Sequence, residues 1–341
     1  MRRILAVLVA AVAFATAPAP ATAEPGVTAT SIVIGQSAPL SGPAMELGTE
    51  MRAGALLYFD YINARGGVNG RTIDLRTLDD GYEPDRAVAN TRRFLEKDDA
   101  FALFGYVGTP TTMAAMPLFT QARVPLVGPF TGAEAFRKPV NRYIFNVRAS
   151  YFQETDDLVE LLTKISESRI AVFYQNDAYG KAGLEGVDRA MKKRKVEIIA
   201  TATVERNSSD VAAAVATIAK ANPQAVIMIG AYKSCAAFIK AMKKAGVFAQ
   251  YMNVSFVGAK ALAAELGNEG RGVGISQVVP FPWNGGVPVV REYQKLSVAK
   301  NGKENYSFTS LEGFIAAKVM VEGLRRAGRD PTRERLVAGL E

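Results

Sequence analysis

Two consecutive series of alternating strand-like and helix-like segments constrain the fold of this chain more than any other feature. The first series places strands and helices in turn at 31–37, 47–64, 72–78, 85–96, 101–107, 111–121 and 124–129. The second series does the same at 169–174, 180–193, 196–204, 209–221, 225–230, 235–245, 251–257, a short helix from 260, and 273–279. Such alternation predicts parallel sheets covered by helices on both faces. We therefore expect an α/β protein of two Rossmann-like lobes, with hinge crossovers and a ligand cleft between the carboxyl ends of the strands.

Helices alone follow Pro282, at 287–300, 310–327 and 332–340. The middle one repeats apolar residues on one face, which predicts that it covers a sheet already built. In the second series, Ser208 or Ser209 is the expected N-cap of the helix at 209–221, because a serine hydroxyl accepts a hydrogen bond from the first helical turn.

The N-terminus is typical of a secretory signal. Arg2 and Arg3 precede an apolar run over 4–16, and the small residues Ala21-Thr22-Ala23 form a cleavage pattern. Residues 1–23 are thus expected to be a cleaved signal peptide, and the protein to be periplasmic. The alternative is an uncleaved anchor, but the run is shorter than the roughly 20 residues that a span needs.

The composition excludes several classes of enzyme. The chain has no histidine and a single cysteine, Cys235, so Ser-His-Asp and Cys-His catalysis, the usual zinc sites and an intrachain disulfide are all ruled out. Cys235 is expected to be a small core residue. The 41 basic and 33 acidic residues are scattered, and no nucleic-acid motif is present. We expect a monomer that is not an enzyme and has no catalytic residue, metal or cofactor.

Several segments of the mature chain resemble the leucine/isoleucine/valine-binding protein family, the periplasmic receptors of ABC importers. They are IVIGQSAPLSGP from Ile32, INARGGVNGRTIDL from Ile62, Asp79-Asp80, GYVGTPTTMAAMPL from Gly105, VPLVGPFTGAEAFR from Val124, DAYG from Asp177 and AGV from Ala245. The resemblance implies a type I periplasmic binding protein fold. Lobe 1 would comprise 24–148 and 277–341, and lobe 2 would comprise 149–276. The partners implied are a small-molecule ligand and an inner-membrane ABC permease.

One departure from the family concerns the C-terminus. Members usually continue beyond the helix that ends here at Leu340. We therefore expect a truncated chain that lacks the last strands of lobe 1, the third crossover and the final segment of lobe 2.

The turn Gly108-Thr109-Pro110-Thr111 is the first candidate ligand contact. It joins a strand to a helix, where backbone N–H groups, the helix dipole and two hydroxyls can bind a carboxylate. The resemblance implies that Thr109 binds the ligand α-carboxylate; the alternative is an ordinary helix cap. Phe130, Thr131 and Gly132 follow the next strand and are candidates for the ligand head group. Phe130 is equally suited to the core.

Lobe 2 offers three candidate tyrosines and one informative mismatch. Tyr179 matches a family tyrosine that closes over the ligand, while Tyr151 and the Ala231-Tyr232 pair are further candidates; each is also compatible with ordinary packing. Ser255 stands where amino-acid-binding members carry a glutamate for the ligand ammonium. We hypothesise a carboxylate ligand that lacks an α-amino group, or whose ammonium is held by Glu46 or Asp177.

Two alternative functions remain at this point. A secreted Rossmann-like enzyme would need a glycine fingerprint after the first strand, but the sequence there is Ser37-Ala38-Pro39-Leu40-Ser41. A ligand sensor that presents its closed form to a signalling receptor would have the same sequence features as a transport receptor.

Overall fold

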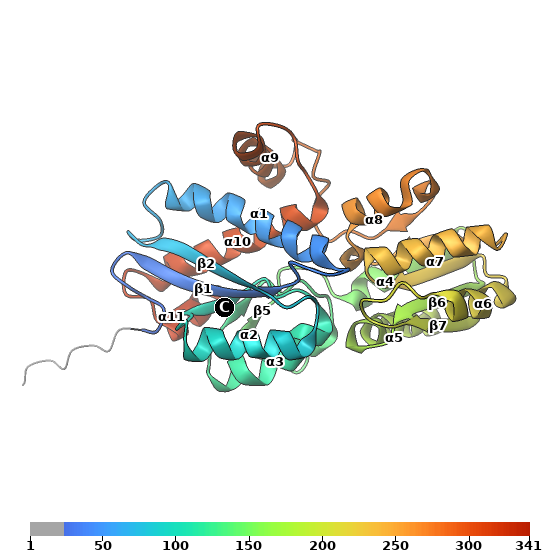
Figure 1. The fold of residues 1–341 in the computed structure, drawn as a ribbon, viewed down its shortest axis with the longest axis horizontal. Helices are drawn as coiled ribbons and strands as arrows, with labels where there is room; N and C mark the ends of the chain where they lie inside the picture. Colours follow the sequence, from blue (N-terminus) through green and yellow to red (C-terminus); the bar gives the residue numbers. More distant parts are fainter. Residues whose placement is uncertain (1–23) are drawn as a thin grey trace, which may run out of the picture.

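The computed structural model describes residues 24–341 and shows two α/β lobes side by side along the long axis of the molecule (Figure 1). Each lobe contains a five-stranded sheet, and every strand pair in both sheets is parallel. The predicted fold class is therefore confirmed. The predicted signal peptide, 1–23, lies outside the described residues. Within 24–341, no helix is both long and apolar enough to cross a membrane.

The first sheet has the order β2-β1-β3-β4-β5. Its strands are β1 (Ser31–Ala38), β2 (Thr72–Asp79), β3 (Ala102–Phe104), β4 (Leu126–Val127) and β5 (Ile144–Phe145). The connecting helices are α1 (Met45–Asn63), α2 (Pro84–Glu96), α3 (Thr109–Gln121) and the short η1 (Glu134–Phe136). In Figure 1, α1 lies above this sheet and α2 and α3 lie below it, so the sheet is covered on both faces.

The second sheet has the order β10-β9-β8-β6-β7. Its strands are β6 (Ile170–Gln175), β7 (Ala200–Val204), β8 (Ala225–Ile229), β9 (Gln250–Asn253) and β10 (Gly274–Ile275). The helical segments are α4 (Tyr151–Lys164), α5 (Ala178–Lys193), α6 (Ala212–Ala221), α7 (Tyr232–Lys244), η2 (Ser255–Val257), α8 (Ala259–Leu266) and η3 (Gly267–Gly270). Cys235 is buried in α7, as predicted.

The chain returns to the first lobe after β10 and forms α9 (Pro288–Asn301), α10 (Phe308–Ala327) and α11 (Arg333–Leu340). Helix α10 packs on α1, β4 and α11, so it covers the first sheet as the sequence predicted. The lobe bounds at 148/149 and 276/277 stay a prediction.

A close backbone contact fixes the crossing of α1 and α10. A Cβ on Gly54 would lie 1.8 Å from the carbonyl oxygen of Ser310, and one on Gly313 would lie 2.2 Å from that of Met51. Only glycine permits this approach at both positions.

Some local predictions differ from the structure. Helix α6 begins at Ala212 with Val211 as its N-cap, because the hydroxyl of Ser208 instead accepts a hydrogen bond from the N–H of Asp210, at 3.0 Å. The strand predicted over 251–257 ends at Asn253, since the N–H of Ser255 donates to the Glu154 carboxylate rather than to a strand. Helix α4 was not predicted, although Ser150 and Gln153 form a capping box at its start.

A buried carboxyl group follows β2. Asp80 accepts hydrogen bonds from the hydroxyl of Ser37, at 2.7 Å, and from the N–H of Tyr82, at 2.8 Å. Burial nevertheless raises the pKa of Asp80 to about 6. Folding thus favours the protonated form of Asp80, which predominates below about pH 6.

We predict that Gly54→Ala destabilises the protein by about 1–3 kcal/mol, because the added methyl group must separate α1 from α10. Helix propensity alone would favour alanine by about 1 kcal/mol, so the sign of the change identifies the packing effect. Urea unfolding measures it. Ala53→Gly, at the exposed neighbouring position, is the control and should cost only the propensity difference.

Asp80 also predicts a pH dependence. Because its folded pKa of about 6 exceeds the ordinary aspartate pKa of 3.8, its favourable contribution is complete below about pH 4 and is lost as the pH rises through 6. The Asp80→Asn variant has no carboxyl group at this position, so its stability should not fall in this way as the pH rises. The melting temperature of Asp80→Asn should therefore rise relative to that of the wild type as the pH increases from 4 to 8. A difference in melting temperature that stays constant over this range would contradict the assignment.

Candidate functional site

The carboxyl ends of the two sheets face each other, and aromatic rings fill the space between them. Phe256 in η2 of the second lobe lies 5.9 Å from Tyr82 and 5.3 Å from Phe130 of the first lobe, measured between ring centroids. It also lies 4.7 Å from Tyr179. Each of these rings is 0–1% exposed, so the lobes are in contact in a closed arrangement.

The predicted anchor turn lies beneath this cluster. The hydroxyls of Thr109 and Thr131 are 2.7 Å apart and hydrogen-bonded, and both residues are buried. Gly108 has a φ of 98°, and a Cβ there would lie 2.2 Å from the Tyr82 ring. No side chain of the described residues caps the start of α3, so its first backbone N–H groups remain available to an anion.

The other first-lobe candidates have more structural roles. The hydroxyl of Thr111 donates to the carbonyl oxygens of Val107 and Gly108 and is thereby committed to the start of α3. The carbonyl oxygen of Gly132 accepts from the N–H of Tyr151, at 2.7 Å. The two lobes thus touch directly at Tyr151.

A buried charge cluster lies where the chain crosses between the lobes. Arg148, just after β5, is 3.7 Å from Glu154 of α4 and 3.5 Å from Glu312 of α10, measured from its side-chain nitrogens to their carboxylate oxygens. The Glu154 carboxylate accepts from the Ser255 N–H, at 2.8 Å, and from the Ser276 hydroxyl, at 2.6 Å. Arg148 also donates to the Ser255 hydroxyl. Both crossings of the chain are therefore joined at this one cluster.

Burial and the neighbouring charges shape the protonation of this cluster. Burial raises the pKa of Glu312 to about 7, although the Arg148 cation opposes the rise. Burial on its own would lower the pKa of Arg148, but the carboxylates of Glu312 and Glu154 outweigh it and raise that pKa. Arg148 is therefore a permanent buried cation beside the cleft.

Sequence reasoning missed this cluster. Arg148 was recognised only as the point where the chain crosses to lobe 2, and Glu154 and Glu312 were not considered. The one available signal was Glu312 itself, a carboxylate among the apolar residues of the helix that covers the first sheet.

Side chains also bridge the lobes at the opposite edge of the cleft, beyond β2 and β7. Arg206 lies 2.7 Å from the Glu83 carboxylate, and the Asn207 side-chain amide donates to Glu83 and to the carbonyl oxygen of Gly81. These contacts close the cleft at the edge formed by β2 and β7. On another side of the cleft, Lys260 of α8 forms an ion pair with Glu50 of α1, at 2.8 Å.

A cavity of about 370 Å³ remains between the lobes, on the side of α1, α7 and α8. Tyr232, Leu47 and the candidate ammonium partner Glu46 line it. Ala231 is the N-cap of α7 directly beside it. The hydroxyl of Tyr232 is buried without a hydrogen-bond partner in the described chain.

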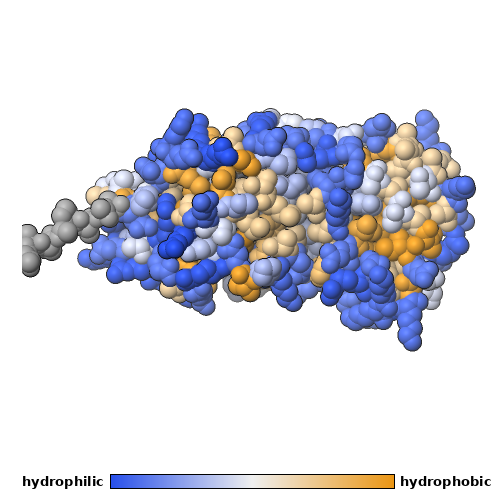
Figure 2. All heavy atoms as spheres, turned by 90° about the horizontal axis from the view of Figure 1, so that it is seen from below, coloured by the Kyte–Doolittle hydropathy of each residue, from blue (hydrophilic) through white to orange (hydrophobic). Residues whose placement is uncertain are grey.

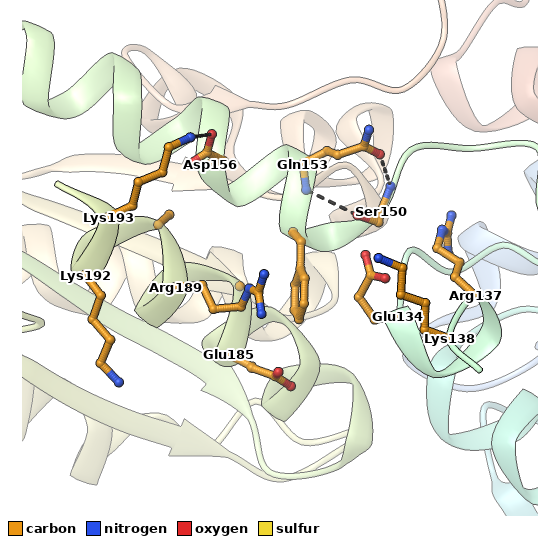
Figure 3. A pocket seen from close by; sticks show the side chains of 13 residues that line it. Glu134, Arg137, Lys138, Ser150, Gln153, Asp156, Glu185, Arg189, Lys192 and Lys193 are labelled. Carbon is orange, nitrogen blue, oxygen red and sulfur yellow. Dashed lines mark hydrogen bonds and ion pairs between the residues drawn. The ribbon is translucent and has the colours of Figure 1, made fainter. Parts of the chain in front are cut away.

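A larger groove of about 1100 Å³ lies between the lobes beside the start of α4 (Figure 3). Figure 3 shows charges of both signs along it, among them Glu134, Lys138, Glu185 and Arg189. Lys193 pairs with Asp156 at 3.0 Å, and Ser150 and Gln153 are bonded to each other in the capping box. This mixture does not select for a ligand of one charge.

The predicted candidates thus divide into three groups. The structure brings Thr109, Phe130, Thr131, Tyr151 and Tyr179 together at the closed centre of the cleft. Ala231 and Tyr232 lie at the neighbouring cavity, and Ser255 lies against Arg148 rather than at a strand end. Ligand binding by each of them stays a prediction. Trp283 is 48% exposed and packs on Phe281.

Comparisons with known proteins agree with this architecture. The periplasmic binding protein family matches residues 31–341. The crystal structure of a possible leucine/isoleucine/valine-binding protein from Rhodopirellula baltica is 36% identical with a TM-score of 0.88, covering 92% of this chain and 86% of that one. A substrate-binding periplasmic protein from Ralstonia solanacearum is 37% identical with a TM-score of 0.86, covering 90% and 88%.

A curated relative gives the same result from sequence. The leucine-, isoleucine-, valine-, threonine-, and alanine-binding protein of Pseudomonas aeruginosa is 24% identical over 307 residues, which cover 89% of this chain and 81% of that protein. With two facing parallel sheets and a cleft between their carboxyl ends, this chain belongs to the periplasmic binding protein family and has the type I fold of the leucine/isoleucine/valine-binding proteins.

Proposed function

We propose that this protein is the periplasmic receptor of a branched-chain-amino-acid-type ABC importer. It binds a small carboxylate-bearing ligand between its lobes and delivers it to an inner-membrane permease. The observation that carries the proposal is the Thr109–Thr131 hydroxyl pair beside the uncapped start of α3, facing Tyr179 and Phe256 of the other lobe. A carboxylate requires such donors when it is removed from water.

Hinge closure follows from the placement of these groups. The anchor turn belongs to the first lobe, whereas Tyr179, Tyr232 and Phe256 belong to the second. A ligand that contacts both sets has higher affinity for the closed arrangement and shifts the population toward it. The permease then distinguishes loaded from empty receptors by the closed shape.

The class of ligand is narrowed by the surroundings of the cleft. The Pseudomonas aeruginosa relative is named for five amino acids, each of which carries a carboxylate and an ammonium group. Here Asp177 is engaged by the Tyr179 N–H at 2.9 Å and by Arg206 at 3.5 Å, so it is a poor ammonium partner. Glu46 lines the 370 Å³ cavity and remains a candidate. We therefore propose a carboxylate that lacks an α-amino group, or whose ammonium binds Glu46.

A thermal-shift screen tests the proposed function. Leucine, valine, benzoate-type acids and short amides are added one at a time, and each stabilising compound is examined by small-angle X-ray scattering. At least one acid should raise the melting temperature, because a ligand that binds only the folded protein stabilises it. It should also favour the compact, closed form. Strong stabilisation by leucine alone would contradict a ligand without an α-amino group and would leave only the alternative in which the ammonium binds Glu46.

Thr109→Ala should weaken binding of the stabilising acid by about 1–3 kcal/mol, because a donor to the carboxylate is lost. Isothermal titration calorimetry measures the affinity. Thr91→Ala is the matched control, since Thr91 is a buried threonine of the same lobe whose hydroxyl bonds to Ala87 and Tyr106 instead. An unchanged affinity in Thr109→Ala would show that the anchor lies elsewhere.

A further inference from the structure

Arg148 carries hydrogen-bond donors that the described protein does not use. Its side chain is 0% exposed, yet Nε and Nη1 have no hydrogen-bond partner among residues 24–341. The neighbouring carboxylates lie at 3.5 and 3.7 Å, beyond the roughly 2.7–2.9 Å of a charge-assisted hydrogen bond. Buried donors are nearly always satisfied, so these two nitrogens, like the unpartnered Oε1 of Glu154 beside them, mark a place where the described side chains leave hydrogen-bonding capacity unused.

A second unsatisfied donor lies beside the first. The hydroxyl of Tyr151 is fully buried near Thr131 and Arg148, and it makes no hydrogen bond of good geometry to a described residue. Burial raises the pKa of Tyr151 to about 12, so this group is a neutral O–H donor at physiological pH. Thr131 is itself bonded to Thr109. The donor groups of Thr109, Thr131, Tyr151 and Arg148 therefore follow one another from the anchor turn to the first crossing.

The guanidinium of Arg148 also borders the cleft directly. It lies 4.8 Å from the ring centroid of Phe130, and Phe130 packs against Phe256 of the opposite lobe at a centroid distance of 5.3 Å. Because these two rings belong to different lobes, an opening of the lobes would part them beside Arg148. A planar fork of N–H groups in that position matches the two oxygens of a carboxylate.

We propose that Arg148, with the hydroxyl of Tyr151, binds the anionic group of the ligand and makes the site selective for acids over their neutral amides. This inference rests on the proposed function but goes beyond it, because Thr109 and the start of α3 would accept either a carboxylate or an amide oxygen. Arg148 adds charge-assisted N–H donors, which bind an anionic oxygen more strongly than the oxygen of a neutral amide, even though Glu154 and Glu312 share its positive charge.

Matched acid and amide pairs test the inference: benzoate with benzamide, leucine with leucinamide, and valine with valinamide. Their affinities for the mature protein are measured by calorimetry. In the pair that binds best, the acid should bind at least about tenfold more tightly than the amide, the effect expected of one charge-assisted hydrogen bond. Equal binding of acid and amide would overturn the inference while leaving the proposed receptor function intact.

Two variants locate the selectivity. Tyr151→Phe removes a hydroxyl that has no partner in the described chain, so it should fold normally and lower the acid-to-amide affinity ratio severalfold. Arg148→Lys keeps the charge but loses the planar fork, and should lower the ratio by about tenfold. Tyr251→Phe, whose hydroxyl bonds to Val247 elsewhere in the second lobe, is the matched control and should leave the ratio unchanged.

Each outcome tests a different part of the proposal. If Arg148→Lys fails to fold, the acid-to-amide affinity ratio of Tyr151→Phe alone tests the inference. A wild-type ratio retained in the folded variants would overturn the assignment of Arg148 and Tyr151. If none of the six compounds binds, the proposed function fails in its carboxylate form, and the inference fails with it.

Discussion

The relation between the two lobes depends on a small group of charges that water does not reach. Arg148, Glu154 and Glu312 come from the first crossing, from α4 and from α10, and Ser276 ties the second crossing to the same Glu154 carboxylate. A buried ion is tolerated only with partners, so every segment that supplies one is held in register with the others. The rest of the cleft, including the contacts at its far edge, is arranged around this fixed point.

Both lobes owe their geometry to ordinary α/β packing. Helices cover each sheet on both faces, and the strands end where the lobes meet (Figure 1). Hydrophilic side chains cover most of the side seen in Figure 2, while apolar ones gather near the middle of the long axis and on one end. The interior therefore supports the loops after the strands, and those loops carry the polar groups of the cleft.

Much of this fold follows from the sequence because strand and helix periodicities are local. The alternation from Ser31 onward predicts both sheets. Of the elements that were missed, β5 has only two residues, whereas α4 has 14 residues and carries both a capping box and apolar residues at helical spacing, among them Leu158 and Leu162. The candidate site was harder to predict. Thr109 and Tyr179 follow from motifs, whereas the meeting of Arg148 with Ser255 and Glu312 joins positions more than 100 residues apart. Hydrophobic periodicity describes only local structure, so it cannot predict a contact between residues this far apart in the sequence.

The aromatic ring of Phe256 has an energetic consequence for any solute that enters between Phe130 and Tyr179. The Phe256 side chain already fills that space, so a ligand competes with it and must make more favourable contacts than the benzyl group that it displaces. The affinity of such a ligand then reflects the difference between its own packing energy in this space and that of the Phe256 ring. Weakly apolar molecules bind poorly because their contacts there are less favourable than those of the ring that they displace. Selection of this kind needs no steric barrier at the entrance.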